Sequence, residues 1–247
     1  MSHAPQPFSG RGAPEALEVT EAARQTEWHH PSFVAELFMG RLLMDLGVPY
    51  PEQSEEDRRL GDEYLGRVEA FLKDQLDPDA VDRTGELPPH VIQGLARLGC
   101  FGMKIPKNYG GLELSQVNYN RVIAAIASYC GSTAVWLSAH QSIGAPQPLM
   151  LFGTDEQKRA FLPRLAAGTI SAFALTELGA GSDPAHMETT ATPIEGGESY
   201  LLNGEKLWCT NGPVAEVVVV MALTPSVTAG GKERKQITAF IVERSMP

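Results

Sequence analysis

The chain has 247 residues, with 30 acidic and 20 basic side chains and a formal net charge of −10. This acidic balance excludes a general nucleic-acid binder, which needs a basic face, and it disfavours docking on anionic lipid. The length is enough for one large domain or two modest ones, each with a hydrophobic core. These properties favour a soluble protein that acts on a small molecule.

Cysteine usage and targeting signals point the same way. Cys100, Cys130 and Cys209 lie far apart and form no C-x-x-C pair, which is typical of structural thiols in a reducing compartment. No histidine joins them at ligand spacing, so we expect no metal site. The chain shows no secretory signal, and the apolar run 217–223 is too short to cross a bilayer. These features predict a cytoplasmic protein without a membrane span.

The first part of the chain is predicted to contain a tail and a helix. Residues 1–31 carry scattered prolines and no periodicity, so we expect a mobile tail. Ser32 is typical of a helix N-cap, and the helix that it begins is expected to continue to Gly47. The apolar face of this helix includes Phe33, Leu37, Phe38 and Leu42.

A second helix is expected after Ser54 and Asp57, which resemble a capping box. Its apolar residues repeat at helical spacing: Leu60, Tyr64, Leu65, Val68, Phe71 and Leu72. Residues 77–85 predict a turn-rich linker. A helix over 88–98 should follow, with Gly99 as its C-terminal stop.

Further helices are expected before residue 170. Ser115 is a suitable N-cap for one helix, and residues 133–144 predict another. Thr154 and Gln157 form a second capping-box pattern ahead of the last one. Residues 32–169 therefore predict an all-helical amino-terminal domain.

The pattern then changes to strands, which are expected over 170–176, 188–194, 198–202, 205–210, 217–223 and 236–243. Gly196-Gly197 and Asn203-Gly204 are typical of hairpin turns. A polar loop is expected over 224–235. An all-helical domain followed by an antiparallel β-barrel-like middle domain over 170–247 predicts an α+β fold.

The first candidate site is FALTELGAGSD over 173–183, at the end of the first expected strand. Small residues let a ligand approach the backbone, where N–H groups and hydroxyls can hold an anionic or carbonyl oxygen. The segment lacks the G-x-G-x-x-G register and strand-to-helix setting of a dinucleotide fingerprint. From the local pattern alone, an ordinary strand-ending loop is the favoured alternative.

The second candidate site is KLWCTNG over 206–212. Strand alternation puts Lys206, Trp208 and Thr210 on one face. A Trp beside a Thr offers a flat wall and a hydroxyl donor, which suits an aromatic cofactor ring. From spacing alone, a Trp that merely covers the sheet is favoured. His140 is expected to be a packed or capping histidine rather than a base.

Taken together, FALTELGAGSD (173–183) and LNGEKLWCTNG (202–212) resemble the paired signature of acyl-CoA dehydrogenases. Residues 139–144 (AHQSIG), 151–154 (LFGT) and 237–244 (ITAFIVER) are similar to the very-long-chain branch of that family. The resemblance covers about residues 32–247. It implies a helical domain and a β domain, and the family's carboxy-terminal four-helix domain is absent from the chain.

The resemblance implies a flavoprotein that oxidises a fatty acyl-CoA to the trans-2-enoyl-CoA in β-oxidation. FAD is the implied cofactor, and an electron-transfer flavoprotein is the implied electron acceptor. The resemblance also implies assembly as a homodimer or homotetramer. In a eukaryote, it implies that the protein is located in the mitochondrial matrix. The implied site residues are Phe173, Leu175 and Thr176 on one flavin wall, Trp208 and Thr210 on the other, and Ser182 at the acyl-CoA.

The chain departs from the family pattern at Leu178, where the family usually has Pro, and at Cys209, where Ile or Ser is common. The family's catalytic glutamate comes from the carboxy-terminal domain, so no catalytic residue is assigned. The leading hypothesis is a truncated acyl-CoA dehydrogenase that is inactive or weakly active alone. One alternative is a subunit of a heteromeric dehydrogenase, and another is a non-catalytic acyl-CoA or flavin-binding module.

Overall fold

The computed structural model describes residues 32–49, 52–229 and 232–247. Within them the chain forms two compact units. The larger unit consists of Gln53–Leu178 and Met187–Pro247, and the smaller one of Gly179–His186 with the described part of Met1–Glu52. The predicted tail over 1–31 lies outside the described residues. The division into domains at residues 32 and 170 stays a prediction.

The smaller unit contains the first predicted helix, α2 (Phe33–Phe38). Its start is confirmed, because the Ser32 hydroxyl accepts a hydrogen bond from the Ala35 N–H at 3.3 Å. Its length is shorter than predicted. Gly40 has a φ of 79°, a left-handed conformation that ends the helix well before Gly47.

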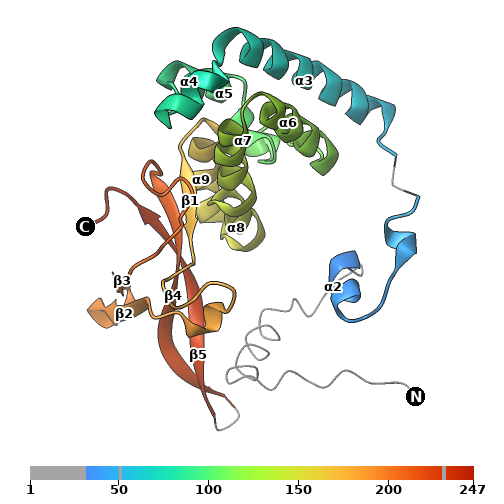
Figure 1. Cartoon of the computed structure of the whole chain (residues 1–247). Coiled ribbons are helices and arrows are strands. Elements are labelled where there is room, and N and C mark those ends of the chain that lie inside the picture. The colour runs from blue at the N-terminus through green and yellow to red at the C-terminus, as the bar shows by residue number, and fades with distance from the viewer. Residues whose placement is uncertain (1–31, 50–51, 230–231) are drawn as a thin grey trace. The chain divides into compact units, whose positions relative to one another are not determined.

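The larger unit opens with a set of helices (Figure 1). They are α3 (Glu55–Gln75), α4 (Pro78–Thr84), α5 (Pro89–Arg97), α6 (Gln116–Tyr129), α7 (Gly131–Ser138), α8 (Pro146–Phe152) and α9 (Asp155–Ala166). Both halves of the predicted capping box form at α9, between Thr154 and Gln157. At α3 only the Ser54 half forms. There the Asp57 carboxylate instead accepts hydrogen bonds from Ser115 and Asn118 at 2.8 and 2.9 Å.

The prediction of a linker over 77–85 is wrong, because these residues form α4. The Asp77 carboxylate caps the helix by accepting from the Ala80 N–H, and Pro78 occupies the first turn, where its missing N–H costs nothing. Gly85 ends the helix with a φ of 70°. The residues that suggested a turn therefore act as the start and stop of a short helix.

The strands of the larger unit are β1 (Ser171–Ala174), β2 (Thr190–Ile194), β3 (Ser199–Asn203), β4 (Val217–Ala229) and β5 (Lys232–Glu243). They form one sheet in which β4 pairs with β1, β2 and β5, and β2 also pairs with β3. The helical-then-β order is confirmed. The sheet is mixed rather than purely antiparallel, because β1 and β4 are joined by a long connection and run parallel.

Two strand predictions need correction. Residues 205–210 are not a strand, because Gly204 and Trp208 have φ values of 156° and 55°, which interrupt a ladder. The loop over 224–235 is also wrong, because β4 and β5 continue as a ribbon through most of it. The Thr224 and Thr238 hydroxyls lie 3.1 Å apart across this ribbon, a cross-strand contact that polar residues can make.

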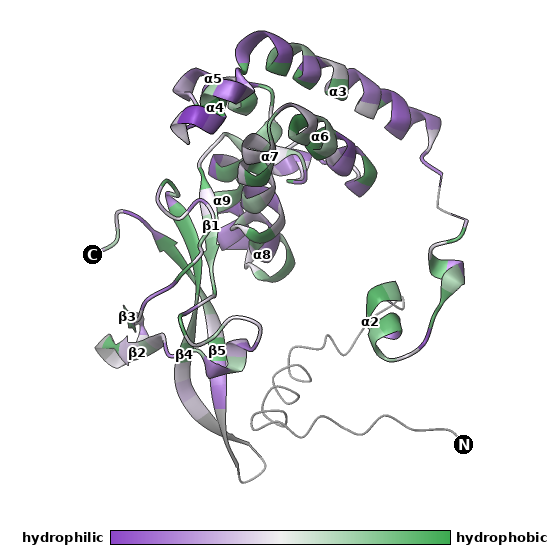
Figure 2. Cartoon of the chain, in the orientation of Figure 1, coloured by the Kyte–Doolittle hydropathy of each residue, from purple (hydrophilic) through white to green (hydrophobic). Residues whose placement is uncertain are grey.

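Two apolar cores stabilise the larger unit. One lies among the helices and includes Leu72, Leu95 and Phe101. The other joins helices to the sheet, because residues of α8 and α9 such as Leu149 pack with Val217 of β4. Figure 2 shows α3 as largely hydrophilic, with more apolar stretches on α7, α8 and the neighbouring part of the sheet. Across the described residues, no helix combines the length and apolarity needed to span a membrane.

The α3–α6 contact provides a stability test at Gly61. A Cβ added there would lie 2.0 Å from Asn118 Oδ1, whereas one added at Gly66 of the same helix would meet no atom within 4 Å. We expect Gly61→Ala to lower the free energy of unfolding by about 1–3 kcal/mol. Gly66→Ala should raise it by up to about 1 kcal/mol. Urea unfolding of both variants checks this, and equal shifts would show that the contact does not restrict Gly61.

Candidate functional site

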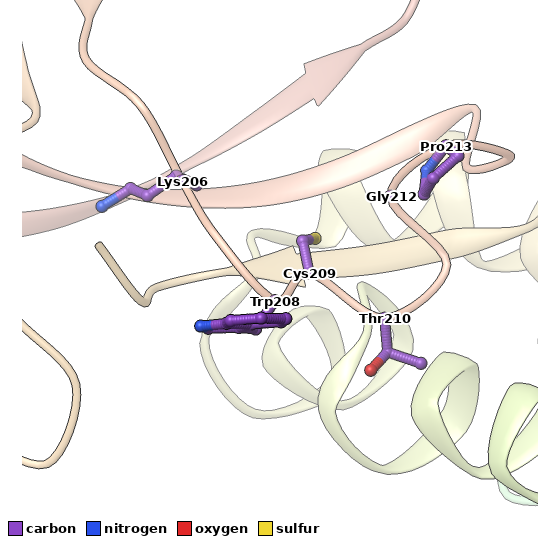
Figure 3. Close-up of a pocket in the computed structure, with 6 residues that line it drawn as sticks. All are labelled: Lys206, Trp208, Cys209, Thr210, Gly212 and Pro213. Atoms are coloured by element: carbon purple, nitrogen blue, oxygen red, sulfur yellow. The ribbon is translucent and has the colours of Figure 1, made fainter. Parts of the chain in front are cut away.

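An open hollow of about 660 Å³ lies along the segment between β3 and β4 (Figure 3). Its lining residues are Lys206, Trp208, Cys209, Thr210, Gly212 and Pro213. The Trp208 side chain is 88% exposed. Figure 3 shows its indole edge-on, with Thr210 further along the same segment. The hollow therefore offers an aromatic plane and a nearby hydroxyl to a ligand.

The backbone of this segment is strained at the residue that carries the indole. Trp208 has a φ of 55°, and a left-handed conformation costs a non-glycine residue about 1–2 kcal/mol. Burial of the indole does not offset this cost, because most of the ring is exposed. A Trp that merely covers the sheet is therefore not what the structure shows. Strain that packing does not explain favours a binding role.

The structure brings residues 173–176 of the first candidate segment next to residues 207–209 of the second. The Leu207 N–H donates to the Thr176 carbonyl at 2.8 Å, and the Cys209 thiol donates to the Phe173 carbonyl at 3.4 Å. Phe173 lies on β1, and Leu175 and Thr176 follow its end. Thr176 is partly exposed and Thr210 is exposed.

Ser182, the predicted acyl-CoA contact, belongs to the smaller unit. It lies in the loop Gly179–His186, where it is exposed. Leu178, just before this loop, is 94% exposed. The role of Ser182 stays a prediction.

A buried ion pair lies beside the hollow. The Lys206 ammonium donates to Glu177 Oε1 at 2.6 Å, and the two side chains are only 10% and 8% exposed. The same ammonium donates to the Leu175 carbonyl at 3.1 Å. Lys206 is thus turned inward, whereas strand alternation had placed it on one face with the exposed Trp208.

Glu177 is held by several donors in addition to Lys206. Its carboxylate accepts hydrogen bonds from the backbone N–H groups of Glu188 and Thr189, at 2.5 and 3.0 Å, and from the Thr189 hydroxyl. Burial alone would raise the pKa of Glu177, but Lys206 and these donors together lower it to about 2. Glu177 is therefore a fixed anion and a poor proton acceptor at neutral pH.

His140 is packed in the core, as predicted. It lies in a π-helical turn, Ala139–Ile143, and is fully buried. The Ser171 N–H donates to His140 Nδ1 at 3.1 Å, which leaves the proton on Nε2 to donate to the Phe101 carbonyl at 3.2 Å. Burial lowers the pKa of His140 to about 4. The imidazole is thus a neutral link between β1 and the helices.

Two further polar side chains fix the turn that follows Thr210. Asn211, at a φ of 67°, donates from Nδ2 to the carbonyls of Trp136 and Ser171 at 3.0 and 3.3 Å. Arg244, just after β5, donates to the carbonyls of residues 212, 213 and 215. The turn is therefore tied to α7, β1 and the end of β5.

A second hollow, of about 420 Å³, runs along α6 and α7 and shares Thr210 with the first. Its other lining residues are Ile123, Ala127, Gly131, Ala134, Val135, Ser138, Ala139, Ser142 and Ile143. Most of these side chains are apolar or small. A groove of this composition suits an aliphatic chain.

Cys100, Cys130 and Cys209 are all free, and the first two are buried. In the part of the chain that the structure describes, no three His, Cys, Asp or Glu side chains gather as metal ligands would.

Reasoning from the sequence missed the roles of Glu177, Lys206, Asn211 and Arg244. The sequence does contain a signal for the ion pair between Glu177 and Lys206. Glu177 is the only charged residue in 165–182, and Lys206 is the only one in 206–215. A single charge in a segment that is otherwise neutral is a candidate for burial with a partner. The signal cannot tell which charge pairs with which.

Comparison with protein families gives two matches in chain order. Residues 54–169 match the acyl-CoA dehydrogenase N-terminal domain, and residues 172–247 match the acyl-CoA dehydrogenase middle domain.

Individual proteins that are similar in sequence belong to the same family. Probable acyl-CoA dehydrogenase FadE10 of Mycobacterium tuberculosis is 48% identical over 94% of this chain and 35% of its own length. The mouse very long-chain specific acyl-CoA dehydrogenase is 38% identical over 94% of this chain and 36% of its own. The chain therefore spans about a third of the length of these relatives.

Solved structures give the same match. Butyryl-CoA dehydrogenase from Megasphaera elsdenii has a TM-score of 0.67 and 31% identity, over 80% of this chain and 50% of its own. An acyl-CoA dehydrogenase from Bacillus anthracis, solved in complex with FAD, has a TM-score of 0.64 and 33% identity, over 78% of this chain and 32% of its own.

Proposed function

The chain belongs to the acyl-CoA dehydrogenase family, and from this membership we propose that it binds FAD and contributes to the α,β-dehydrogenation of a fatty acyl-CoA. The observation that carries the proposal is the exposed indole of Trp208 on a strained backbone, in the same hollow as the exposed residue Thr210. Two segments remote in sequence meet there. Such a junction provides both an aromatic wall and hydrogen-bond donors.

The residues present fit a flavin. Trp208 would supply a face for the ring system, and Thr210 and Thr176 would donate hydrogen bonds to its polar edge. Phe173 and Leu175 would complete the wall on the β1 side. FAD, when bound, supplies the hydride acceptor of the reaction. This chain's residues orient the ring and exclude water from one side of it.

The apolar groove along α6 and α7 supports a fatty acyl substrate. It reaches the flavin wall at Thr210, so an aliphatic chain lying in it would end beside the proposed ring. Ser182 is the proposed contact for the acyl-CoA. An electron-transfer flavoprotein as acceptor and a homodimeric or homotetrameric assembly complete the proposal.

The catalytic base is proposed to come from the family's carboxy-terminal helical domain, and no residue of this chain is assigned that role. The segment 173–183 contains two acidic residues, Glu177 and Asp183. Asp183 lies 2.8 Å from His186 Nδ1, and the Glu177 carboxylate is already occupied by Lys206 and Thr189. With a pKa of about 2, Glu177 is a poor acceptor for a substrate proton. The role of this chain is therefore binding and orientation rather than proton abstraction.

Replacing Trp208 tests the proposed flavin wall. Trp208→Ala should weaken FAD binding about tenfold or more, because the variant loses the stacking face. Thr210→Val, which removes only the hydroxyl, should weaken it about fivefold. Titration calorimetry or flavin fluorescence measures both dissociation constants.

A suitable control is Tyr200→Ala, which removes a partly exposed aromatic side chain of β3 that does not line the hollow. Its FAD affinity should equal that of the unsubstituted chain. Equal affinities for Trp208→Ala and the unsubstituted chain would contradict the proposed site.

A further inference from the structure

The segment that carries Trp208 has little sheet structure to hold it. The β2–β3 ladder ends at Asn203, and residues 204–209 belong to no strand. A backbone hydrogen bond from the Leu207 N–H to the Thr176 carbonyl ties the segment to the end of β1. The position of the indole therefore depends on side-chain contacts as well as on the backbone.

Lys206, which precedes Leu207 in the sequence, makes these side-chain contacts. Its ammonium donates to the Leu175 carbonyl at 3.1 Å and to the Glu177 carboxylate at 2.6 Å. These two partners flank Thr176 in the sequence. Together with the Leu207 hydrogen bond, these two Lys206 contacts fix residues 206–207 against residues 175–177. The next residue is Trp208, whose side chain is exposed.

The Glu177 end of the Lys206–Glu177 ion pair is also fixed by several contacts. The Glu177 carboxylate also accepts from the N–H groups of Glu188 and Thr189, which precede β2. Of the ion pairs among the described residues, this is the one in which both side chains are at most 10% exposed. A buried, multiply bonded pair has one geometry, whereas a surface pair samples many.

We propose that Lys206 is a positioning residue for the Trp208 indole, acting through its buried contacts with Glu177 and the Leu175 carbonyl. It holds the wall formed by Trp208 at a fixed place relative to the wall formed by Thr176. The importance of this placement for cofactor binding rests on the proposed function. The placement itself is a property of this chain's own residues and is testable without a cofactor.

The test follows the indole directly by 19F NMR of the chain labelled with 5-fluorotryptophan. The sequence contains only Trp28, Trp136 and Trp208, so single Trp→Phe substitutions assign the three resonances. Lys206→Met should shift or broaden the Trp208 resonance and weaken FAD binding about tenfold. Lys206→Arg, which keeps the charge and the donors, should restore both.

Three further variants separate positioning from stability. Lys206→Met leaves Glu177 buried without its cation. The double variant Lys206→Met/Glu177→Gln removes both charges and is expected to keep the fold. Its Trp208 resonance should still be displaced. Asn118→Ala, which destabilises the distant α3–α6 contact, should leave that resonance unchanged, and so should Lys73→Met at an exposed lysine.

The outcomes are distinct. An unchanged Trp208 resonance in the folded double variant overturns the positioning role, even if the unsubstituted chain binds FAD. If the unsubstituted chain does not bind FAD, the proposed function fails, and the resonance alone decides the role of Lys206. A displaced resonance that Lys206→Arg restores supports it in either case.

Discussion

Replacing Glu177 by alanine is expected to lower the free energy of unfolding by about 3–5 kcal/mol, because the change leaves a buried ammonium without its anion. The Lys206 ammonium would keep only the Leu175 carbonyl as a partner. The N–H groups of Glu188 and Thr189 would also lose their acceptor. Chemical unfolding at neutral pH measures the loss.

A surface glutamate provides the matched control. Glu63 pairs with Arg59 at 3.9 Å, and both side chains are about two-thirds exposed (66% and 67%). Glu63→Ala should therefore change the free energy of unfolding by no more than about 0.5 kcal/mol. Similar losses for the two variants would show that the Glu177 pair is no more important than a surface pair.

The pH dependence of the Glu177 contribution has a defined sign. The folded-state pKa is about 2, below the ordinary value of 4.5, so folding favours the carboxylate. The stabilisation is complete above about pH 4.5 and is lost as the pH falls towards 2. It amounts to about 3 kcal/mol, and Glu177→Gln should lack this part of the acid transition.

Replacing His140 by alanine is expected to cost a similar amount, about 3–5 kcal/mol. The change would open a cavity beside Phe101, whose ring packs edge-on to the imidazole at 5.3 Å. It would also leave the Ser171 N–H and the Phe101 carbonyl without their partner. Because Ser171 begins β1, the loss should loosen the strand that leads to Thr176.

His140 also makes the protein sensitive to acid at a higher pH than Glu177 does. Its folded-state pKa is about 4, below the ordinary 6.5, so the unfolded chain takes up a proton that the folded chain resists. Stability should fall by about 3 kcal/mol between pH 6.5 and 4, and this contribution should level off below pH 4. His140→Ala should lack this slope.

His90 is the control for this prediction, because it is exposed on α5 and bonds only the Gln75 carbonyl at 3.1 Å. His90→Ala should cost less than about 1 kcal/mol and retain the slope between pH 6.5 and 4. If His90→Ala removed the pH dependence of stability between pH 6.5 and 4, and His140→Ala retained it, the assignment to His140 would be contradicted.

Much of the helical part could be predicted from the sequence, because its signals are local. Ser54, Ser115 and Thr154 cap the helices that they were expected to begin. The failure at 77–85 has a physical cause. Asp, Pro and Gly serve both as turn residues and as helix boundaries, and seven residues carry too little periodicity to decide.

The candidate site was harder to predict from the sequence than the helices were. The alternation rule failed at 205–210 because Trp208 adopts a left-handed backbone that no local pattern announces. The partners of Lys206 lie 29 to 31 residues away, so the buried pair is a property of the tertiary fold. The resemblance to a family selected Trp208 and Thr176, but the geometry was needed to connect them through Lys206.

The proposed function is tested by the visible spectrum of the purified chain with FAD, before and after anaerobic addition of a long-chain acyl-CoA. We expect a bound, oxidised flavin whose spectrum changes when the acyl-CoA binds. It should not bleach at an enzymatic rate if the base lies elsewhere as proposed, because the loss of a general base costs about 10²–10⁴-fold in rate. Failure to bind FAD would contradict the proposed site, and full bleaching at an enzymatic rate would contradict the proposal that the base lies elsewhere.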